Sequence, residues 1–150
     1  MCNRGVAAIV ARMERTTLRR TVELECDAAT LWRLISDAGE LGAWLGEDVH
    51  LDLRVGGSGR LVDDDGVRRD LVVTGMTVGE RLAFTWWPAG DEPGGSDVAF
   101  TVEETETGSR LVITESVDPS IDGASARALS GSWETRVVSL WMSVCSLTRV

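Results

Sequence analysis

The sequence predicts an α+β fold in which an antiparallel sheet of about six to seven strands is covered by one long C-terminal helix. Between residues 17 and 117, several short segments alternate apolar and polar residues with a period of two. Most connections between these segments are of hairpin length, so neighbouring strands should be antiparallel. Residues 124–149 instead repeat apolar side chains with a helical period, which suits a helix that covers one sheet face.

The first strand is expected over residues 17–26, and Asp27 follows it as a helix N-cap. The apolar spacing predicts a helix from there to Ser36. Two glycines then interrupt the pattern, so a second, short helix should end near Leu45. Further strands are expected over residues 49–55, 60–62, 67–76, 81–87, 98–102 and 110–117.

The long helix should present a broad apolar stripe to the sheet. Its positions are spaced as the inward face of an amphipathic helix requires. The stripe contains Trp133, Val137, Leu140, Trp141 and Val144, and it is widened by Val138, Met142 and Cys145.

Residues 51–66, LDLRVGGSGRLVDDDG, resemble a phosphate-binding loop at first sight. A Walker loop needs a lysine, and this chain has none; a dinucleotide fingerprint needs a third glycine and a following helix. The aspartates lack the closing glutamate of a calcium loop. The glycines at 56–59 and the pair Asp65-Gly66 are therefore interpreted as two turns between strands.

Composition limits the classes of function. The 150 residues carry a net charge of -9, which argues against nucleic-acid and anionic-membrane partners. Lysine and tyrosine are absent, so Schiff-base and phenol chemistry are unavailable. The three cysteines are far apart, which argues against a structural zinc site and suits a reducing compartment. We therefore expect a cytoplasmic protein with no metal and no cofactor.

The domain organisation is expected to be simple. Residues 1–15 contain the apolar run GVAAIVA, which is too short for a signal peptide and has no cleavage site. We interpret them as a flexible tail, or as residues upstream of a true start at Met13. Residues 16–150 show neither an internal repeat nor a linker. They should form a single domain.

The order of these segments resembles the START-like helix-grip superfamily, in particular the branch named after homologues of the heat-shock-protein-90 ATPase activator. The matching pieces are TVELECDAATLWRLISD, LGAWLGEDVHLDLRVGGSGR, GERLAFTWW, GSRLVITE and a helix bearing Trp133. The resemblance as a whole extends over roughly residues 17 to 148. One departure is Asp27-Ala28-Ala29, where the family often has a proline, but Asp27 still supplies a helix cap.

The resemblance implies a curved sheet that grips the C-terminal helix, with a cavity between them. Superfamily members bind lipids, polyketides, hormones or other apolar molecules; some are cyclases, and some confer resistance by sequestering a toxic metabolite. The chaperone activity of the eukaryotic namesake is not carried over, because it also depends on a separate domain. Bacterial members mostly have no assigned reaction, and we expect this chain to be bacterial.

The six tryptophans suggest which side chains would line such a cavity, since aromatic rings suit an apolar guest. The same rings could equally fill a core without a guest. The candidate ligand-binding residues are Trp44, Phe84, Trp86, Phe100, Ile113, Glu115, Trp133, Val137 and Trp141.

Polar candidates are few. Glu115 shares its side of the strand with Ile113, so it should point inward, where it could orient a ligand, act as a base, or pair with Arg127 or Arg136. His50, the only histidine, should face outward, so no catalytic triad is predicted.

These observations favour a noncatalytic protein that binds a small hydrophobic or aromatic molecule, in stress response, resistance or secondary metabolism. A cyclase or hydrolase that uses the same cavity is the alternative, and a module that binds a chaperone or regulator is a third. The protein should be a monomer or a homodimer.

Overall fold

The computed structural model describes residues 16–63, 66–91, 95–117 and 123–148. The predicted tail therefore lies outside the described residues. Three helices are described: α2 (Ala28–Ser36), α3 (Ala38–Leu41) and α4 (Gly123–Thr148). The strands are β1 (Thr16–Leu24), β2 (Glu47–Leu51), β3 (Ser58–Val62), β4 (Arg68–Thr77), β5 (Arg81–Pro88), β6 (Ser96–Thr105) and β7 (Gly108–Val117).

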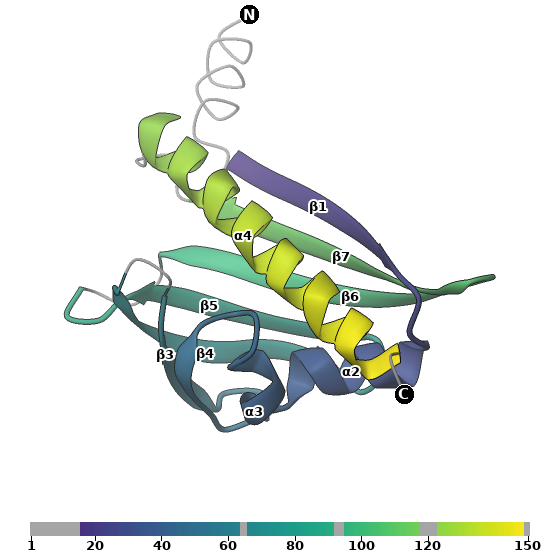
Figure 1. Cartoon of the computed structure of the whole chain (residues 1–150). Helices are drawn as coiled ribbons and strands as arrows, with labels where there is room; N and C mark the ends of the chain where they lie inside the picture. Colours follow the sequence, from purple (N-terminus) through teal and green to yellow (C-terminus); the bar gives the residue numbers. More distant parts are fainter. Residues whose placement is uncertain (1–15, 64–65, 92–94, 118–122, 149–150) are drawn as a thin grey trace, which may run out of the picture.

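The strands form one antiparallel sheet in the order β1-β7-β6-β5-β4-β3-β2. From β2 to β7 the chain adds each strand beside the previous one, while β1 pairs with β7 at the far edge. In Figure 1, α4 crosses one face of the sheet diagonally. The α+β helix-grip fold is therefore confirmed.

The core lies between this face of the sheet and the helices. Leu31, Leu34 and Ile35 of α2 are buried, as their spacing predicted. Inward side chains alternate along the strands; in β5 they are Leu82, Phe84 and Trp86, each no more than 3% exposed. Within the described residues, none of the helices is both long enough and apolar enough to cross a bilayer.

Two predicted elements are shorter than expected. The second helix, α3, ends at Leu41, and residues 42–45 continue it only as turns. The strand predicted over 49–55 is β2, which ends at Leu51 because the chain turns back there into β3. That turn explains its glycines: a Cβ on Gly57 would lie 2.0 Å from the Asp52 carbonyl oxygen.

The glycine-rich stretch is therefore a pair of connections between strands. Gly56 and Gly66 adopt φ values of 85° and 82°, which L side chains rarely adopt. Gly66 donates its N–H to the Asp63 carbonyl and so closes the turn between β3 and β4.

The stripe predicted on α4 is partly wrong. Trp133, Leu140 and Val144 are buried and Val137 is half-buried. In contrast, Val138, Trp141 and Met142 are 56%, 54% and 60% exposed. The physical reason is that α4 contacts the sheet along one narrow line of positions, and each further residue turns about 100° around the helix axis, away from that line.

Asp27 caps α2 as predicted, and this gives a test of helix stability. Its side chain accepts the Thr30 N–H at 2.8 Å. Hydrogen bonds from the side chain and backbone of Thr30 lower the pKa of Asp27 below its ordinary value of 3.8. The cap is therefore fully effective above pH 3.8 and is lost as the pH falls through the lower, folded-state pKa.

We expect Asp27→Ala to lower the melting temperature at pH 7, whereas Asp27→Ser, which keeps an acceptor, should restore most of the loss. Melting measured from pH 7 down to pH 2 should show the deficit of Asp27→Ala shrinking below pH 3.8. A deficit that stays constant to pH 2 would show that the charge of Asp27 plays no part.

Candidate functional site

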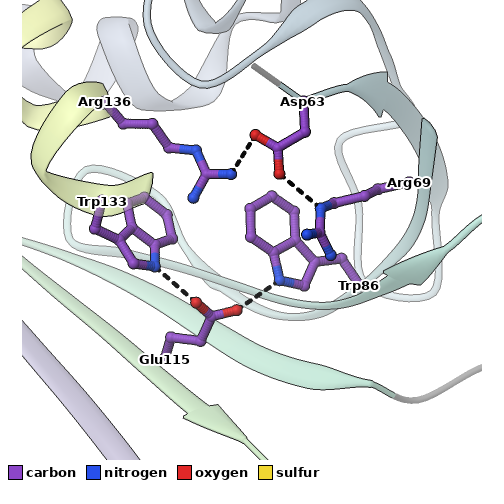
Figure 2. Close-up of polar contacts among 6 residues, drawn as sticks. All are labelled: Asp63, Arg69, Trp86, Glu115, Trp133 and Arg136. Carbon is purple, nitrogen blue, oxygen red and sulfur yellow. Dashed lines mark hydrogen bonds and ion pairs between the residues drawn. The ribbon is translucent and has the colours of Figure 1, made fainter. Parts of the chain in front are cut away.

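A carboxylate buried between two tryptophans forms the centre of the site. Glu115 of β7 is 1% exposed. Its Oε2 accepts the Trp86 Nε1–H from β5 at 2.7 Å, and its Oε1 accepts the Trp133 Nε1–H from α4 at 2.7 Å. Figure 2 shows both indole N–H groups directed at this carboxylate. One acidic side chain therefore ties the long helix to two strands of the sheet.

A second buried carboxylate, Asp63, lies at the end of β3. Its Oδ1 accepts from Nη2 of Arg136 on α4 at 2.5 Å, and its Oδ2 accepts from Nε of Arg69 on β4 at 2.8 Å. The Arg136, Asp63 and Arg69 side chains are 0%, 2% and 13% exposed. Both guanidiniums pair with Asp63. Together with Glu115 there are two carboxylates and two guanidiniums, so the formal charges balance.

The indole rings join the two halves of the site. Trp86 and Trp133 stack with ring centroids 5.9 Å apart and an interplanar angle of 25°. The Arg136 guanidinium carbon lies 4.9 Å from the Trp86 centroid and 4.5 Å from that of Trp133. Arg69 also lies over Trp86, at 4.9 Å. Such cation–π contacts partly replace the water that a buried guanidinium loses. We call this set the buried polar cluster: Asp63, Arg69, Trp86, Glu115, Trp133 and Arg136.

Arg136 is incompletely paired within this cluster. Its Nε and Nη1 are buried and have no hydrogen-bond partner among the described residues. An arginine carries five N–H donors, and a buried donor without an acceptor is costly. An oxygen acceptor beside these nitrogens, from water or from a bound molecule, would remove that cost.

The predicted aromatic residues are brought together, but they pack against one another. Phe84 contacts Trp86 and Phe100 with centroid distances of 5.4 and 5.6 Å. Phe100 also contacts Trp44 at 5.4 Å and Trp133 at 6.0 Å. These rings and Ile113 are at most 3% exposed. These candidate side chains therefore form one continuous, mainly aromatic core.

Three placements differ from the sequence prediction or extend it. Trp141 is 54% exposed, so its side chain lies on the outside of α4 and not in the interior. Glu115 does not pair with Arg136, because that guanidinium is turned toward Asp63. Arg127 lies where no side chain is described.

Sequence reasoning missed Asp63 and Arg69. Asp63 belongs to the acidic run that does not fit a calcium loop, and it shares its side of the strand with buried Leu61. Arg69 likewise shares its side with Leu71. Strand parity therefore indicated that both charges point inward, but parity alone does not reveal a partner on α4.

The outer face of the sheet carries two hollows. Cross-strand pairing lines up His50, Arg60, Asp70 and Trp87. They lie beside hollows of 350 and 540 Å³, which share His50, Arg60 and Asp70. His50 is exposed and lies on the side of the sheet opposite Leu61, as predicted. These hollows do not involve any residue of the predicted cavity.

In the part of the chain that is described, no three histidine, cysteine, aspartate or glutamate side chains gather closely enough to hold a metal ion. The polar groups that lie inside the fold beside the aromatic faces are two guanidiniums, two carboxylates and two indole N–H donors. Such a set is suited to holding a molecule in place.

Comparison with known proteins points to one family. The model of the family described as activator of Hsp90 ATPase homolog 1-like protein matches residues 25–140. No curated protein sequence gives a significant match.

Solved structures share the fold. DynU16, from the dynemicin biosynthetic locus, has a TM-score of 0.75 and 23% identity over 84% of this chain; the match spans only 46% of DynU16. A protein from Mesorhizobium loti has a TM-score of 0.74 and 23% identity over 90% of this chain and 100% of its own. The Aha1 dimer from Colwellia psychrerythraea has a TM-score of 0.72 and 17% identity, covering 86% of this chain and 96% of the other.

Proposed function

Since this chain belongs to the family of activator of Hsp90 ATPase homolog 1-like proteins, we propose that it binds a small molecule between its sheet and α4 without converting it. The guest has a flat apolar or aromatic body and at least one oxygen acceptor. We place this role in secondary metabolism, resistance or stress response, in the cytoplasm of a bacterium.

The observation that carries the proposal is the unpaired half of Arg136. Its Nε and Nη1 lie in the interior, next to two indole faces, with no acceptor among the described residues. Asp63 accepts from Nη2 and so holds the guanidinium in a fixed orientation, with the Nε–H and the Nη1–H groups directed to different sides. A carbonyl, phenolate or carboxylate oxygen is the natural acceptor for either group.

Room for a guest requires some movement of α4, because the aromatic rings are in contact. The aromatic body of a guest that enters beside Arg136 would add stacking contacts to Trp86 and Trp133.

Binding is favoured over catalysis by the state of Glu115. A general base needs a carboxylate oxygen that can reach a substrate proton. Both oxygens of Glu115 already accept an indole N–H at 2.7 Å, and the side chain is 1% exposed. Its geometry suits an anchor for two tryptophans. The DynU16 locus supports the secondary-metabolism setting, since that relative with the same fold belongs to a biosynthetic locus.

Native mass spectrometry of the full chain, purified gently from its own host, tests the proposal. We expect a discrete extra mass above 16.2 kDa that is lost on denaturation. The double variant Asp63→Leu/Arg136→Met, in which apolar residues replace this ion pair, should lose the extra mass while remaining folded. Arg60→Met on the outer face is the control and should retain it. A clean apo mass for the wild type, with no aromatic oxygen-bearing compound from a host extract retained on dialysis, would contradict the proposal.

A further inference from the structure

The outer face of the sheet carries a row of side chains that the proposed function does not use. His50, Arg60, Asp70 and Trp87 lie in register across β2, β3, β4 and β5. Neighbouring strands are about 4.8 Å apart, so these side chains form one line across the sheet. We call these four residues the outer row.

The two hollows on this face meet at the outer row and differ in character. Asp48 and Arg68 border the hollow of 350 Å³. Leu51, Val72 and Trp87 border the hollow of 540 Å³. The three other members of the outer row border both. The site therefore has a charged end and an end with apolar and aromatic surface, as an amphipathic small molecule requires.

The charged groups at this site are not paired with one another. Arg60 lies directly opposite Asp70 on the next strand, yet the two side chains form no ion pair. Within the ranges that the structure describes, Asp48 and Arg68 likewise make no side-chain hydrogen bond or ion pair. Trp87 is half-buried, and its ring contacts no other aromatic ring or guanidinium in those ranges. All of these groups are therefore available to a ligand.

The edge of the sheet is irregular at the same place. The register between β2 and β3 shifts between Glu47 and His50. Asp48 has a φ of 49° and is the one non-glycine residue with a positive φ in the described part of the chain. Bulges recur beside binding sites, where they re-aim a side chain, and such strained backbone clusters at ligand sites. Both irregularities adjoin the 350 Å³ hollow.

We propose that the outer row binds a small aromatic amino acid. Arg60 and Arg68 offer two guanidiniums for its carboxylate, and the carboxylates of Asp48 and Asp70 accept from its ammonium group. Trp87 offers a ring face to its side chain. The order Arg60, Asp70, Trp87 along the row matches the order of carboxylate, ammonium and ring in the ligand.

The charges favour a zwitterion over a simple anion or cation. Two unpaired arginines and two unpaired aspartates border the site, so its formal charge is balanced. The chain as a whole carries -9, which repels an anion. A simple cation would leave both guanidiniums without an acceptor. A zwitterion has no net charge and satisfies both kinds of group.

An NMR titration of the isotope-labelled full chain with L-phenylalanine tests the proposal. We expect saturable shifts of the Trp87 indole N–H and of the backbone amides of β3 and β4, with a dissociation constant of about 1 mM or tighter. The signal of Trp87 is identified by its loss in Trp87→Leu. The indole N–H signals of Trp86 and Trp133, which donate to Glu115 in the interior, should not move. This pattern separates binding at the outer row from entry into the proposed inner cavity.

Analogues of the ligand test each contact on the wild-type protein. Phenylpropionate lacks the ammonium group, phenylethylamine lacks the carboxylate, and L-alanine lacks the ring. Each should bind at least about tenfold more weakly than L-phenylalanine, because one charge-assisted or stacking contact is lost. Since no residue is changed, these comparisons do not depend on the stability of a variant.

Variants test the residues. Arg60→Met, Asp70→Asn and Trp87→Leu should each weaken binding of L-phenylalanine by about tenfold or more. Arg19→Met is the matched control for Arg60→Met, because Arg19 is exposed and lies on β1, at the other end of the sheet. It should bind as the wild type does.

Four results would overturn the inference. The first is the absence of shifts at several millimolar L-phenylalanine. The second is movement of the Trp86 and Trp133 signals in place of Trp87, which would place the ligand in the interior. The third is phenylpropionate that binds as tightly as L-phenylalanine, since the site would then recognise an anion. The fourth is an Arg60→Met variant that binds as tightly as Arg19→Met.

Discussion

Replacing Glu115 with leucine is expected to lower the free energy of unfolding by about 3 to 6 kcal/mol, because two buried indole N–H groups lose a charged acceptor and each such bond contributes about 1.5–3 kcal/mol. Both bonds are 2.7 Å long and fully buried, so water cannot replace the carboxylate without opening the core. Chemical unfolding followed by circular dichroism measures the change without relying on the fluorescence of the affected tryptophans.

Graded variants distinguish this anchor from general packing. Glu115→Gln keeps one acceptor oxygen and turns an NH₂ group toward the other indole, so it should lose about half of the stabilisation. The double variant Trp86→Phe/Glu115→Leu leaves only the Trp133 indole N–H without an acceptor. Adding Glu115→Leu to Trp86→Phe should therefore lower the free energy of unfolding by less than Glu115→Leu does in the wild type. Glu103→Leu, at an exposed ion pair with Arg110, is the control and should change little. Equal losses for Glu115→Gln and Glu115→Leu would contradict this account.

The sheet and α2 were predictable from the sequence because each follows from local periodicity. A period of two placed Phe84 and Trp86 on the inward face, and the spacing after Asp27 placed Leu31, Leu34 and Ile35 in the core. Glu115 was also correctly placed inward by parity. These features depend only on neighbours along the chain.

The partners inside the site were not predictable, because they depend on how α4 is rotated over the sheet. Periodicity gave a broad stripe that included Trp141, whereas the helix buries Trp133, Arg136, Leu140 and Val144. A small rotation decides whether Arg136 meets Glu115 or Asp63. The second acidic partner comes from the end of β3, 73 residues before Arg136 in the chain, and nothing local to either residue indicates that they meet.

The second large loss of stability is expected on replacing Asp63. Asp63→Ala should lower the free energy of unfolding by about 3–5 kcal/mol, because it leaves the Arg136 guanidinium buried without a counter-charge. Arg69 loses the same partner, but its side chain is 13% exposed. Water can therefore hydrate its guanidinium, and the free-energy penalty is smaller than for Arg136. Urea unfolding of the full chain measures the difference, and Asp97→Ala, an exposed aspartate that accepts a hydrogen bond from Thr85, is a suitable control with a small effect.

The double variant Asp63→Leu/Arg136→Met makes the test decisive. Well-packed apolar residues that replace a buried ion pair are often neutral or stabilising by about 1–4 kcal/mol, so the double variant should be far more stable than Asp63→Ala and close to the wild type. Stability alone would then give no reason to keep Arg136, with its unpaired Nε and Nη1, in the interior. A charge pair that can be replaced without loss of stability, but not without loss of the guest, is retained for binding. If the double variant is instead as unstable as Asp63→Ala, the ion pair is structural and the assignment of Arg136 to a ligand fails.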